Sequence, residues 1–485
     1  MRRRRGLAAG AHLPHWYMPM RDPVVSVADS VAHVAARLER LPPTRTLWRL
    51  VGLLALGGFF ELYDLFQTAY ISPGLLHDGI FAEGAAGVFG ISDQGAFGMA
   101  TFLGLFVGAS VLSPFTDRFG RRPVFTFALL WYCIATVAMG LQHSALGVIL
   151  WRGVVGIGLG IELVTIDTYL SELVPRQMRS AAFAFAFCLQ FLAVPAVALS
   201  AWLLVPHAPL GISGWRWVVL LSGGFAVAVW WLRSRLPESP RWLATQGRQV
   251  EADTVLIELE ARCSADLGRA LPAPEPEPAV TAPPPRFAAL WQVPYRRRML
   301  MLVGFHVFQA VGFFGFSNWL PKLLAKQGAD SVHSLGYSFA IALAYPLGPL
   351  LLLRFAQRWE NKAQVVVSAL GAVLFGTLFA WQSQPLTIIA CGAAIAACNA
   401  WMSFAYHGYQ AELFPTALRA RAVGFCYSFS RLSTAFSSLL IGFLMDNTGQ
   451  RVGPVLACIV ASMLIAALVV GVFGPVTRNR SLERI

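Results

Sequence analysis

The chain has 485 residues, of which 56% are hydrophobic and only 13% are charged, with a mean hydropathy of +0.59 and a formal net charge of +13. Soluble globular proteins carry charged residues at about 25% of their positions, so this composition excludes a water-soluble globule. It predicts a polytopic membrane protein, in which helices of about 20 apolar residues satisfy their own backbone hydrogen bonds.

Residues 1–46 precede the first apolar segment and open with four arginines at positions 2–5. No apolar stretch typical of a signal peptide follows, so we expect a cytoplasmic arm rather than a cleaved leader. Within this arm, residues 24–41 repeat apolar side chains at helical spacing. That pattern predicts either a helix lying on the membrane surface or a loosely ordered tail.

Twelve later segments are apolar enough to cross a membrane, six within residues 47–236 and six within residues 299–474. Between the two sets, residues 237–298 contain a short amphipathic helix and a proline-rich stretch, which together are typical of a linker. Residues 475–485 form a tail. The predicted fold is an all-α polytopic membrane protein with 12 transmembrane helices. The helices are expected at residues 48–73, 95–116, 122–142, 145–171, 180–205, 216–236, 299–322, 336–354, 363–382, 386–411, 422–445 and 453–474.

The motif YxxExxPxxxR occurs twice, and the second copy begins 240 residues after the first. This repeat indicates that the two six-helix sets are copies of one unit. Such duplication is typical of transporters whose halves move against each other around a central binding site. The two copies are formed by Tyr169, Glu172, Pro175, Arg179, Tyr409, Glu412, Pro415 and Arg419.

The basic residues predict the orientation of the chain. If the amino terminus is cytoplasmic, 32 of the 38 lysines and arginines fall in cytoplasmic segments, where short loops rich in these residues remain. We therefore expect a multi-pass protein of the bacterial inner (plasma) membrane with both termini in the cytoplasm. The net charge then reflects topology, so no nucleic-acid partner is expected.

The sequence also limits the source of energy. Its only lysines are Lys322, Lys326 and Lys362, and none follows the glycine that a phosphate-binding loop requires. HExxH and CxxC motifs are absent, so we expect no metal and no cofactor, and no enzyme motif is present. The GxGxG run at residues 156–160 lies in an apolar segment and is interpreted as helix packing. Transport driven by an ion gradient, a channel, and a transporter-shaped sensor stay open.

Several motifs resemble the major facilitator superfamily, in its sugar porter and metabolite:proton symporter branch. They are DRFGRR from Asp117, RxxxGxGxG from Arg152, both copies of YxxExxPxxxR, PESPRWL from Pro237, and the PVTRNRSLERI tail. The resemblance implies two pseudo-symmetric six-helix bundles that rock about a central site. It further implies a small-molecule substrate and a proton as partners, within a lipid bilayer, for a protein expected to act as a monomer.

Differences from the motifs of the hexose porters restrict the class of substrate that we expect. The QQxSGxN motif of their seventh helix is reduced here to Gln309 among apolar residues, and their GPxPW motif is missing from the tenth helix. The ELYD run at residues 61–64 and the SNWLP run at residues 317–321 resemble metabolite:proton symporters, whose substrates are often small organic acids. We therefore expect proton-coupled symport of a carboxylate. A sugar or other neutral-solute porter, and a metabolite exporter, are the alternatives.

Charged side chains at membrane depth are the candidates for coupling. Glu61 and Asp64 lie three residues apart on one face of the first expected span, and a carboxylate in such a place is costly and by default functional. Burial raises a carboxyl pKa and so favours proton exchange. We predict that Asp64 is the coupling acid, with Glu61 as its partner or alternative. The resemblance suggests Arg152 as the counter-charge. A purely structural ion pair is the competing interpretation.

Arg431 lies in the middle of the eleventh expected span, and its guanidinium suits a carboxylate because it can donate two parallel hydrogen bonds. We predict an anion site there, with a packing cation as the alternative. Other polar residues of the expected spans are predicted to complete the substrate site, namely Gln190, Gln309, Asn318, Asn399, Tyr406 and His407.

The repeated motif places matched acids and bases at the expected cytoplasmic helix ends. These charges predict a gate that forms between the halves when the cavity faces outward and separates when it faces inward. Each exposed pair contributes only about 0.2–1 kcal/mol, so the gate would depend on their number. Topology-setting charge alone is the alternative. The predicted gate residues are Asp117, Arg118, Arg122, Glu172, Arg179, Glu238, Glu412 and Arg419.

Overall fold

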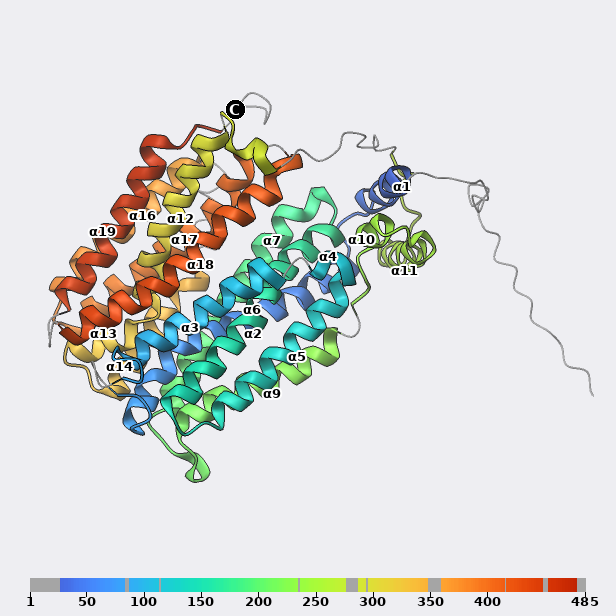
Figure 1. Cartoon of the computed structure of the whole chain (residues 1–485). Coiled ribbons are helices and arrows are strands. Elements are labelled where there is room, and N and C mark those ends of the chain that lie inside the picture. The colour runs from blue at the N-terminus through green and yellow to red at the C-terminus, as the bar shows by residue number, and fades with distance from the viewer. Residues whose placement is uncertain are drawn as a thin grey trace, which may run out of the picture.

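The computed structural model describes residues 27–82, 87–112, 115–233, 236–275, 287–293, 295–347, 359–414, 416–447 and 452–477. Every regular element in these ranges is helical (Figure 1). Two groups of long helices, which we call the N-half and the C-half, lie side by side, and a third, smaller group caps one end.

The N-half contains the first six expected spans. Its helices are α2 (Arg45–His77), α3 (Asp93–Val107), the π-helical turn η2 (Gly108–Leu112), α4 (Phe115–Phe119), α5 (Arg121–Gly140), α6 (Ala145–Leu173), α7 (Arg176–Phe191), α8 (Ala193–Leu204), η3 (Pro209–Gly211) and α9 (Gly214–Arg233). The span expected at residues 180–205 is divided into two helices, α7 and α8. Pro195 lies in the first turn of α8, and its ring and missing N–H interrupt a continuous helix at this point.

The C-half contains the other six. Its helices are α12 (Tyr295–Ser317), α13 (Leu320–Lys326), α14 (Ser331–Ala342), α16 (Asn361–Trp381), α17 (Pro385–Glu412), α18 (Thr416–Asn447) and α19 (Gly453–Phe473), preceded by η4 (Phe287–Trp291). Within the described ranges, ten spans are long and apolar enough to cross a membrane. The other two expected positions correspond to α9 and α14, and the end of the second lies outside the described residues. The structure thus confirms the predicted architecture.

Glycines bring α3 and α6 into close contact. A Cβ atom at Gly156 would lie 2.4 Å from the carbonyl oxygen of Thr101, and one at Gly160 would lie 2.3 Å from that of Leu105. No larger residue fits at either position without movement of the backbone. This confirms the interpretation of the GxGxG run as a packing motif.

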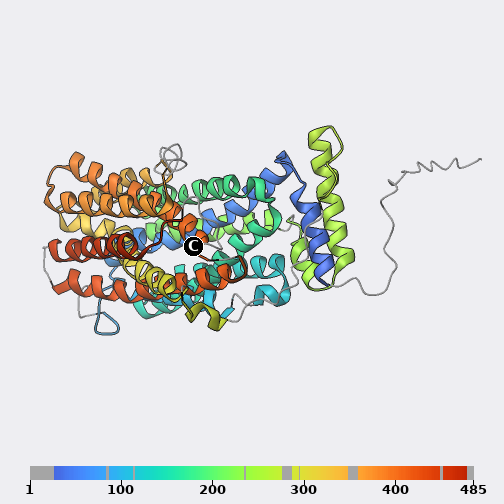
Figure 2. The same ribbon diagram turned by 90° about the horizontal axis from the view of Figure 1, so that it is seen from above.

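A cap of three helices covers one end of the N-half, which we call the α11 end. It consists of α1 (Val27–Glu39), α10 (Pro240–Thr245) and α11 (Gln249–Leu267), which lie together in Figure 2. Arg37 of α1 donates to Glu260 at 2.9 Å and to Asp253 at 2.7 Å, both on α11. The amphipathic helix of the arm therefore packs on the linker helices, whereas the sequence predicted a surface helix or a loose tail.

The two halves contact each other most closely away from the α11 end. There α3 packs against α18, α8 against α14, and α13 against α2. A Cβ atom at Gly442 would lie 3.3 Å from the Cα atom of Gly95, so the first turn of α3 touches the backbone of α18. The interface between the two halves is therefore tightly packed at the end opposite the α11 end.

Candidate functional site

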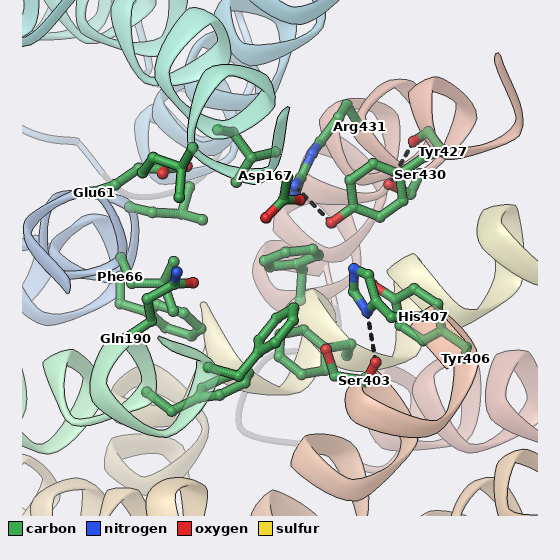
Figure 3. Close-up of a pocket in the computed structure, with 18 of the residues that line it drawn as sticks. Glu61, Phe66, Asp167, Gln190, Ser403, Tyr406, His407, Tyr427, Ser430 and Arg431 are labelled. Atoms are coloured by element: carbon green, nitrogen blue, oxygen red, sulfur yellow. Dashed lines mark hydrogen bonds between the residues drawn. The ribbon is translucent and has the colours of Figure 1, made fainter. Parts of the chain in front are cut away.

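A cavity lies between the two halves, with walls from α2, α6 and α7 on one side and α12, α17 and α18 on the other (Figure 3). Its volume is about 90 Å³. One water needs roughly 10–15 Å³ on this measure, so the cavity holds several waters or one small solute. Its polar lining consists of Glu61, Asp167, Gln190, Gln309, Ser403, Tyr406, His407, Tyr427, Ser430 and Arg431.

Arg431 supplies the positive charge of this cavity. Its side chain is held by Tyr427, one helical turn earlier on α18, whose hydroxyl accepts a hydrogen bond from Nη2 at 2.9 Å. The guanidinium also lies over the ring of Tyr427, 4.8 Å from its centre. Arg431 is only 3% exposed, and its Nε has no hydrogen-bond partner among the described residues. A donor of this kind, fixed and incompletely used, suits an acceptor that enters the cavity.

Asp167 of α6 faces Arg431 from the other half. The two side chains point toward one another in Figure 3, and they attract each other electrostatically. Asp167 is exposed to the cavity, and no hydrogen bond or salt bridge to another described residue engages its carboxylate. On sequence grounds Asp167 ranks below Asp64 and Glu61 as a coupling acid, and its place near the expected cytoplasmic end of its span makes it a candidate gate residue as well.

Aromatic rings and a histidine form the wall on α17. The ring of His407 stacks on Tyr406 with centres 4.2 Å apart and approaches Phe187 of the N-half at 5.0 Å. Its Nδ1 lies 2.6 Å from the carbonyl oxygen of Ser403. Because a carbonyl only accepts, Nδ1 carries the proton, and a neutral ring keeps Nε2 as an acceptor. The wall therefore offers flat ring faces together with a hydrogen-bond acceptor at Nε2 of His407.

Asp64 and Arg152 lie outside this cavity. Both side chains are fully buried, and Arg152 Nη1 donates to Asp64 Oδ1 at 2.5 Å. Asp64 also accepts from Gln67 at 2.6 Å, Thr136 at 2.8 Å and Ser222 at 3.4 Å. All of these partners belong to the N-half. The predicted pairing of Asp64 with Arg152 is present, whereas the predicted coupling role of Asp64 stays a prediction.

The remaining predicted substrate residues divide into two groups. Arg431, Gln190, Gln309, Tyr406 and His407 line the cavity together with Glu61. Asn318 and Asn399 do not line it, although both are buried and neither amide group has a hydrogen-bond partner among the described residues. Asn399 borders a separate cavity of about 10 Å³ within the C-half. Sequence reasoning missed Tyr427 and Ser430, which lie within one helical turn of Arg431 on α18. The mid-helix position of Arg431 was the signal that could have found them.

The predicted gate residues of the N-half are paired within that half. Glu172 accepts from Arg121 at 2.9 Å, and Glu238 accepts from the backbone amides of Arg121 and Arg122. Burial raises the pKa of the Glu238 carboxyl, although backbone hydrogen bonds oppose that shift. The predicted residue Arg118 is exposed beside Phe119. The side chain of Asp117 lies outside the described residues.

The C-half repeats this arrangement with a neutral partner. Glu412 accepts from Asn361 at 2.8 Å, and Asn361 occupies the position equivalent to Arg121. The motif tyrosine also has the same partner in both copies, because Tyr169 donates to the carbonyl oxygen of Pro237 and Tyr409 to that of Pro475. Each tyrosine ties the fourth span of its half to the segment that follows the sixth.

No ion pair between described residues joins the halves at the α11 end. Arg179 and Arg419, the equivalent arginines of the two motifs, instead repel one another there. Arg179 lies 3.8 Å from Glu39 of α1, and Glu39 is also paired with Arg241 at 2.5 Å. The charged gate between the halves therefore stays a prediction.

The family and the similar proteins named below are all described as transporters. The profile of the "Sugar (and other) transporter" family matches residues 51–485. The chain is 28% identical to the "Putative metabolite transport protein YyaJ" of Bacillus subtilis, over 93% of this chain and 97% of that protein. It is 26% identical to the "Niacin transporter NiaP" of Acinetobacter baylyi, over 93% and 99%.

One more relative is named for its substrate, and one solved structure resembles this chain in fold. The chain is 26% identical to the "Gallate transporter" of Pseudomonas putida, over 86% of this chain and 90% of that protein. A partially occluded, inward-open structure of the xylose transporter XylE from E. coli superposes with a TM-score of 0.71, at 17% identity, over 90% and 99%. At that identity the structural similarity shows the fold.

Proposed function

Because the chain belongs to the sugar (and other) transporter family of the major facilitator superfamily, we propose that it moves a small organic carboxylate across the membrane together with a proton. It would do so as a monomer by alternating access, with both termini and the α11 end in the cytoplasm of a bacterial cell. The chain is an integral membrane transporter and not an enzyme.

The observation that carries this proposal is the position of Arg431. The guanidinium lies in the cavity wall between the halves, it is 3% exposed, and its Nε has no hydrogen-bond partner among the residues that the structure describes. A buried cation with a free donor is costly unless an acceptor completes it, and a carboxylate does so with charge-assisted hydrogen bonds. The site therefore favours an anionic solute over a neutral one.

The rings around the cavity favour an aromatic carboxylate. Phe187, Tyr406, Phe313 and Tyr427 supply apolar faces and edges beside the arginine. Aromatic pairs prefer offset-stacked or edge-to-face contacts and gain about 0.5–1.5 kcal/mol beyond area burial. Two similar proteins are named for niacin and gallate, which are both ring compounds with a carboxylate.

Proton coupling rests on the acids at membrane depth and on the solved neighbours, one of which is described as a D-xylose-proton symporter. Asp64 with Arg152 was predicted for this role, and Glu61 and Asp167 are the acids that line the cavity itself. Transport driven by the proton gradient would need one of them to change its protonation between the two open states.

A neutral solute such as a sugar is the second candidate. The amide side chains of Gln190 and Gln309 face the same cavity and can hydrogen-bond hydroxyl groups. If the substrate is neutral, the charge of Arg431 has no function in binding. This alternative predicts that xylose would bind as well as any carboxylate.

Binding of three probes to the purified full-length protein tests the proposal. Nicotinate, its neutral amide nicotinamide, and xylose are compared by thermal shift and calorimetry. We expect nicotinate alone to stabilise the protein. Arg431→Lys keeps the charge but loses the planar fork, and we expect it to weaken nicotinate binding about tenfold, by loss of one charge-assisted hydrogen bond of roughly 1.5 kcal/mol. Arg248→Lys, an exposed arginine on the α11 side, is the matched control. Equal binding of nicotinamide, or unchanged affinity in Arg431→Lys, contradicts the carboxylate assignment.

A further inference from the structure

We propose that Asp167 competes with the substrate carboxylate for Arg431, so that Asp167 takes up a proton when the substrate binds and the two enter together. This inference rests on the proposed function, because it presupposes a carboxylate substrate at Arg431. It assigns the coupling step to an acid of the cavity instead of the sealed acid Asp64.

The first argument is the position of Asp167 between the halves. Asp167 belongs to α6 of the N-half and Arg431 to α18 of the C-half, and their side chains face each other in the cavity (Figure 3). Their attraction therefore changes when the halves move. Asp64, in contrast, has its charge partner and its hydrogen bonds within one half, so rocking of the halves leaves them in place.

The second argument is that the carboxylate of Asp167 is not committed elsewhere. Within the described ranges it makes no hydrogen bond or salt bridge, and solvent in the cavity reaches it. It can exchange a proton with that solvent without breaking a structural bond. Asp64 would have to give up contacts to Arg152, Gln67 and Thr136 to do the same.

The third argument is the charge of the cavity. Its charged lining residues are Glu61, Asp167 and Arg431, which sum to −1 when both acids are ionised. A substrate carboxylate would bring this to −2 in a site of low dielectric constant, where like charges repel strongly. One proton on Asp167 restores the original charge and frees Arg431 for the substrate.

Other titratable groups face the same space and must be considered. Tyr427 lies on α18, Tyr406 and His407 lie on α17, and Glu61 lies on α2. His407 uses Nδ1 as a donor to the carbonyl of Ser403, so it could accept a proton only at Nε2. The lining from α7 and α12 consists of amide and aromatic side chains without charge. His407 and Glu61 are therefore the competing proton acceptors.

Proton uptake on binding tests the inference directly. The purified full-length protein in weakly buffered detergent solution receives nicotinate, and a pH indicator reports the protons taken up. We expect about one proton per nicotinate bound for the unchanged protein and none for Asp167→Asn, which still binds nicotinate. The apparent Kd of the unchanged protein should weaken as pH rises, by up to about tenfold per pH unit, because binding and protonation are linked. The Kd of Asp167→Asn should stay constant between pH 6 and pH 8.

Five further variants separate this inference from its competitors. The exposed control Glu258→Gln and Asp167→Glu should keep the proton uptake. Asp64→Asn, His407→Gln and Glu61→Gln are compared per nicotinate bound, and each variant that still binds nicotinate should take up about one proton. The inference is overturned if Asp167→Asn still takes up a proton, or if Asp64→Asn, His407→Gln or Glu61→Gln abolishes the uptake while nicotinate still binds. If the unchanged protein binds neither nicotinate nor benzoate, the proposed function fails and this inference fails with it.

Discussion

Among the described residues, two acid–arginine pairs at membrane depth can be compared, and their surroundings differ in almost every respect. Asp64 and Arg152 are fully buried and hydrogen-bonded within the N-half. Asp167 and Arg431 come from different halves and border a cavity that solvent enters. The first pair resembles the interior of a folded unit, whereas the second lies on a surface between two units.

This difference shows why a charge within a membrane is not by itself evidence of coupling. A pair with all of its partners in one rigid unit can hold that unit together and yet be unaffected when the unit moves. A pair that spans the moving boundary changes its energy with each movement, and such a pair can therefore link binding to the position of the halves.

The largest expected effect is a difference in protein stability between variants of the two pairs. Arg152→Leu leaves Asp64 as an uncompensated acid in a sealed site, and breaking a buried pair in this way costs about 3–5 kcal/mol. Thermal unfolding in detergent should show a large loss of stability. Arg431→Leu is the matched variant, and it should lose less than half as much because solvent can reach Asp167. Equal losses for the two variants would mean that the pairs are energetically alike.

The second effect distinguishes the pairs by transport. In vesicles with an imposed difference of one pH unit, a one-proton symporter of a monovalent anion should accumulate nicotinate about tenfold, which corresponds to about 1.4 kcal/mol. We expect Asp167→Asn to equilibrate nicotinate without accumulation. Folded Asp64→Asn should still accumulate it. Loss of accumulation in Asp64→Asn alone would instead support the role predicted from the sequence.

The smallest effect extends the comparison to an acid–arginine cluster outside the membrane. Burial would raise the pKa of Glu260, but hydrogen bonds from Arg37 and Arg40 lower it below its ordinary value. A lowered folded-state pKa contributes stability above the unfolded value of about 4.3, and this stability is lost as the pH falls through the folded-state pKa. The protection factors of the α1 amides, which are corrected for the intrinsic exchange rate at each pH, should therefore fall below about pH 4, by less than about 1 kcal/mol in opening free energy. Glu260→Gln should remove this pH dependence, and an equal dependence in that variant would exclude Glu260 as its source.

Much of the fold follows from the sequence because hydropathy and duplication are local or periodic signals. Span lengths predict the helices, and the repeated motif predicts the two halves. Mid-membrane polar residues such as Arg431, Gln190 and His407 were found in the same way, since a polar group in a span is costly enough to be conspicuous. Arg431 and the repeated tyrosines, Tyr169 and Tyr409, also indicated which helices carry functional residues.

Other features depend on which face a helix turns toward the opposite half, and the sequence does not contain that directly. Asp64 and Asp167 are both acids in apolar spans, yet one faces α5 and α6 within its half and the other faces α18. Asn318 and Asn399 turn away from the cavity although their spans border it. The packing of α1 on α11 likewise depends on Arg37 meeting Glu260, more than two hundred residues away.

The repeated tyrosine motif has a consequence for how the two halves respond to their surroundings. In the N-half the adjoining contact is an ion pair between Arg121 and Glu172, with side chains 9% and 17% exposed, whereas in the C-half it is the neutral bond from Asn361 to Glu412. Dissolved salt screens a partly buried ion pair only weakly, because its atoms lie closer together than the screening length of about 8 Å at physiological concentration. It affects a hydrogen bond from a neutral amide to a carboxylate still less. High salt would therefore loosen the first junction slightly more than its counterpart, so the two repeats of the motif would differ in their sensitivity to the ions of the surrounding solution.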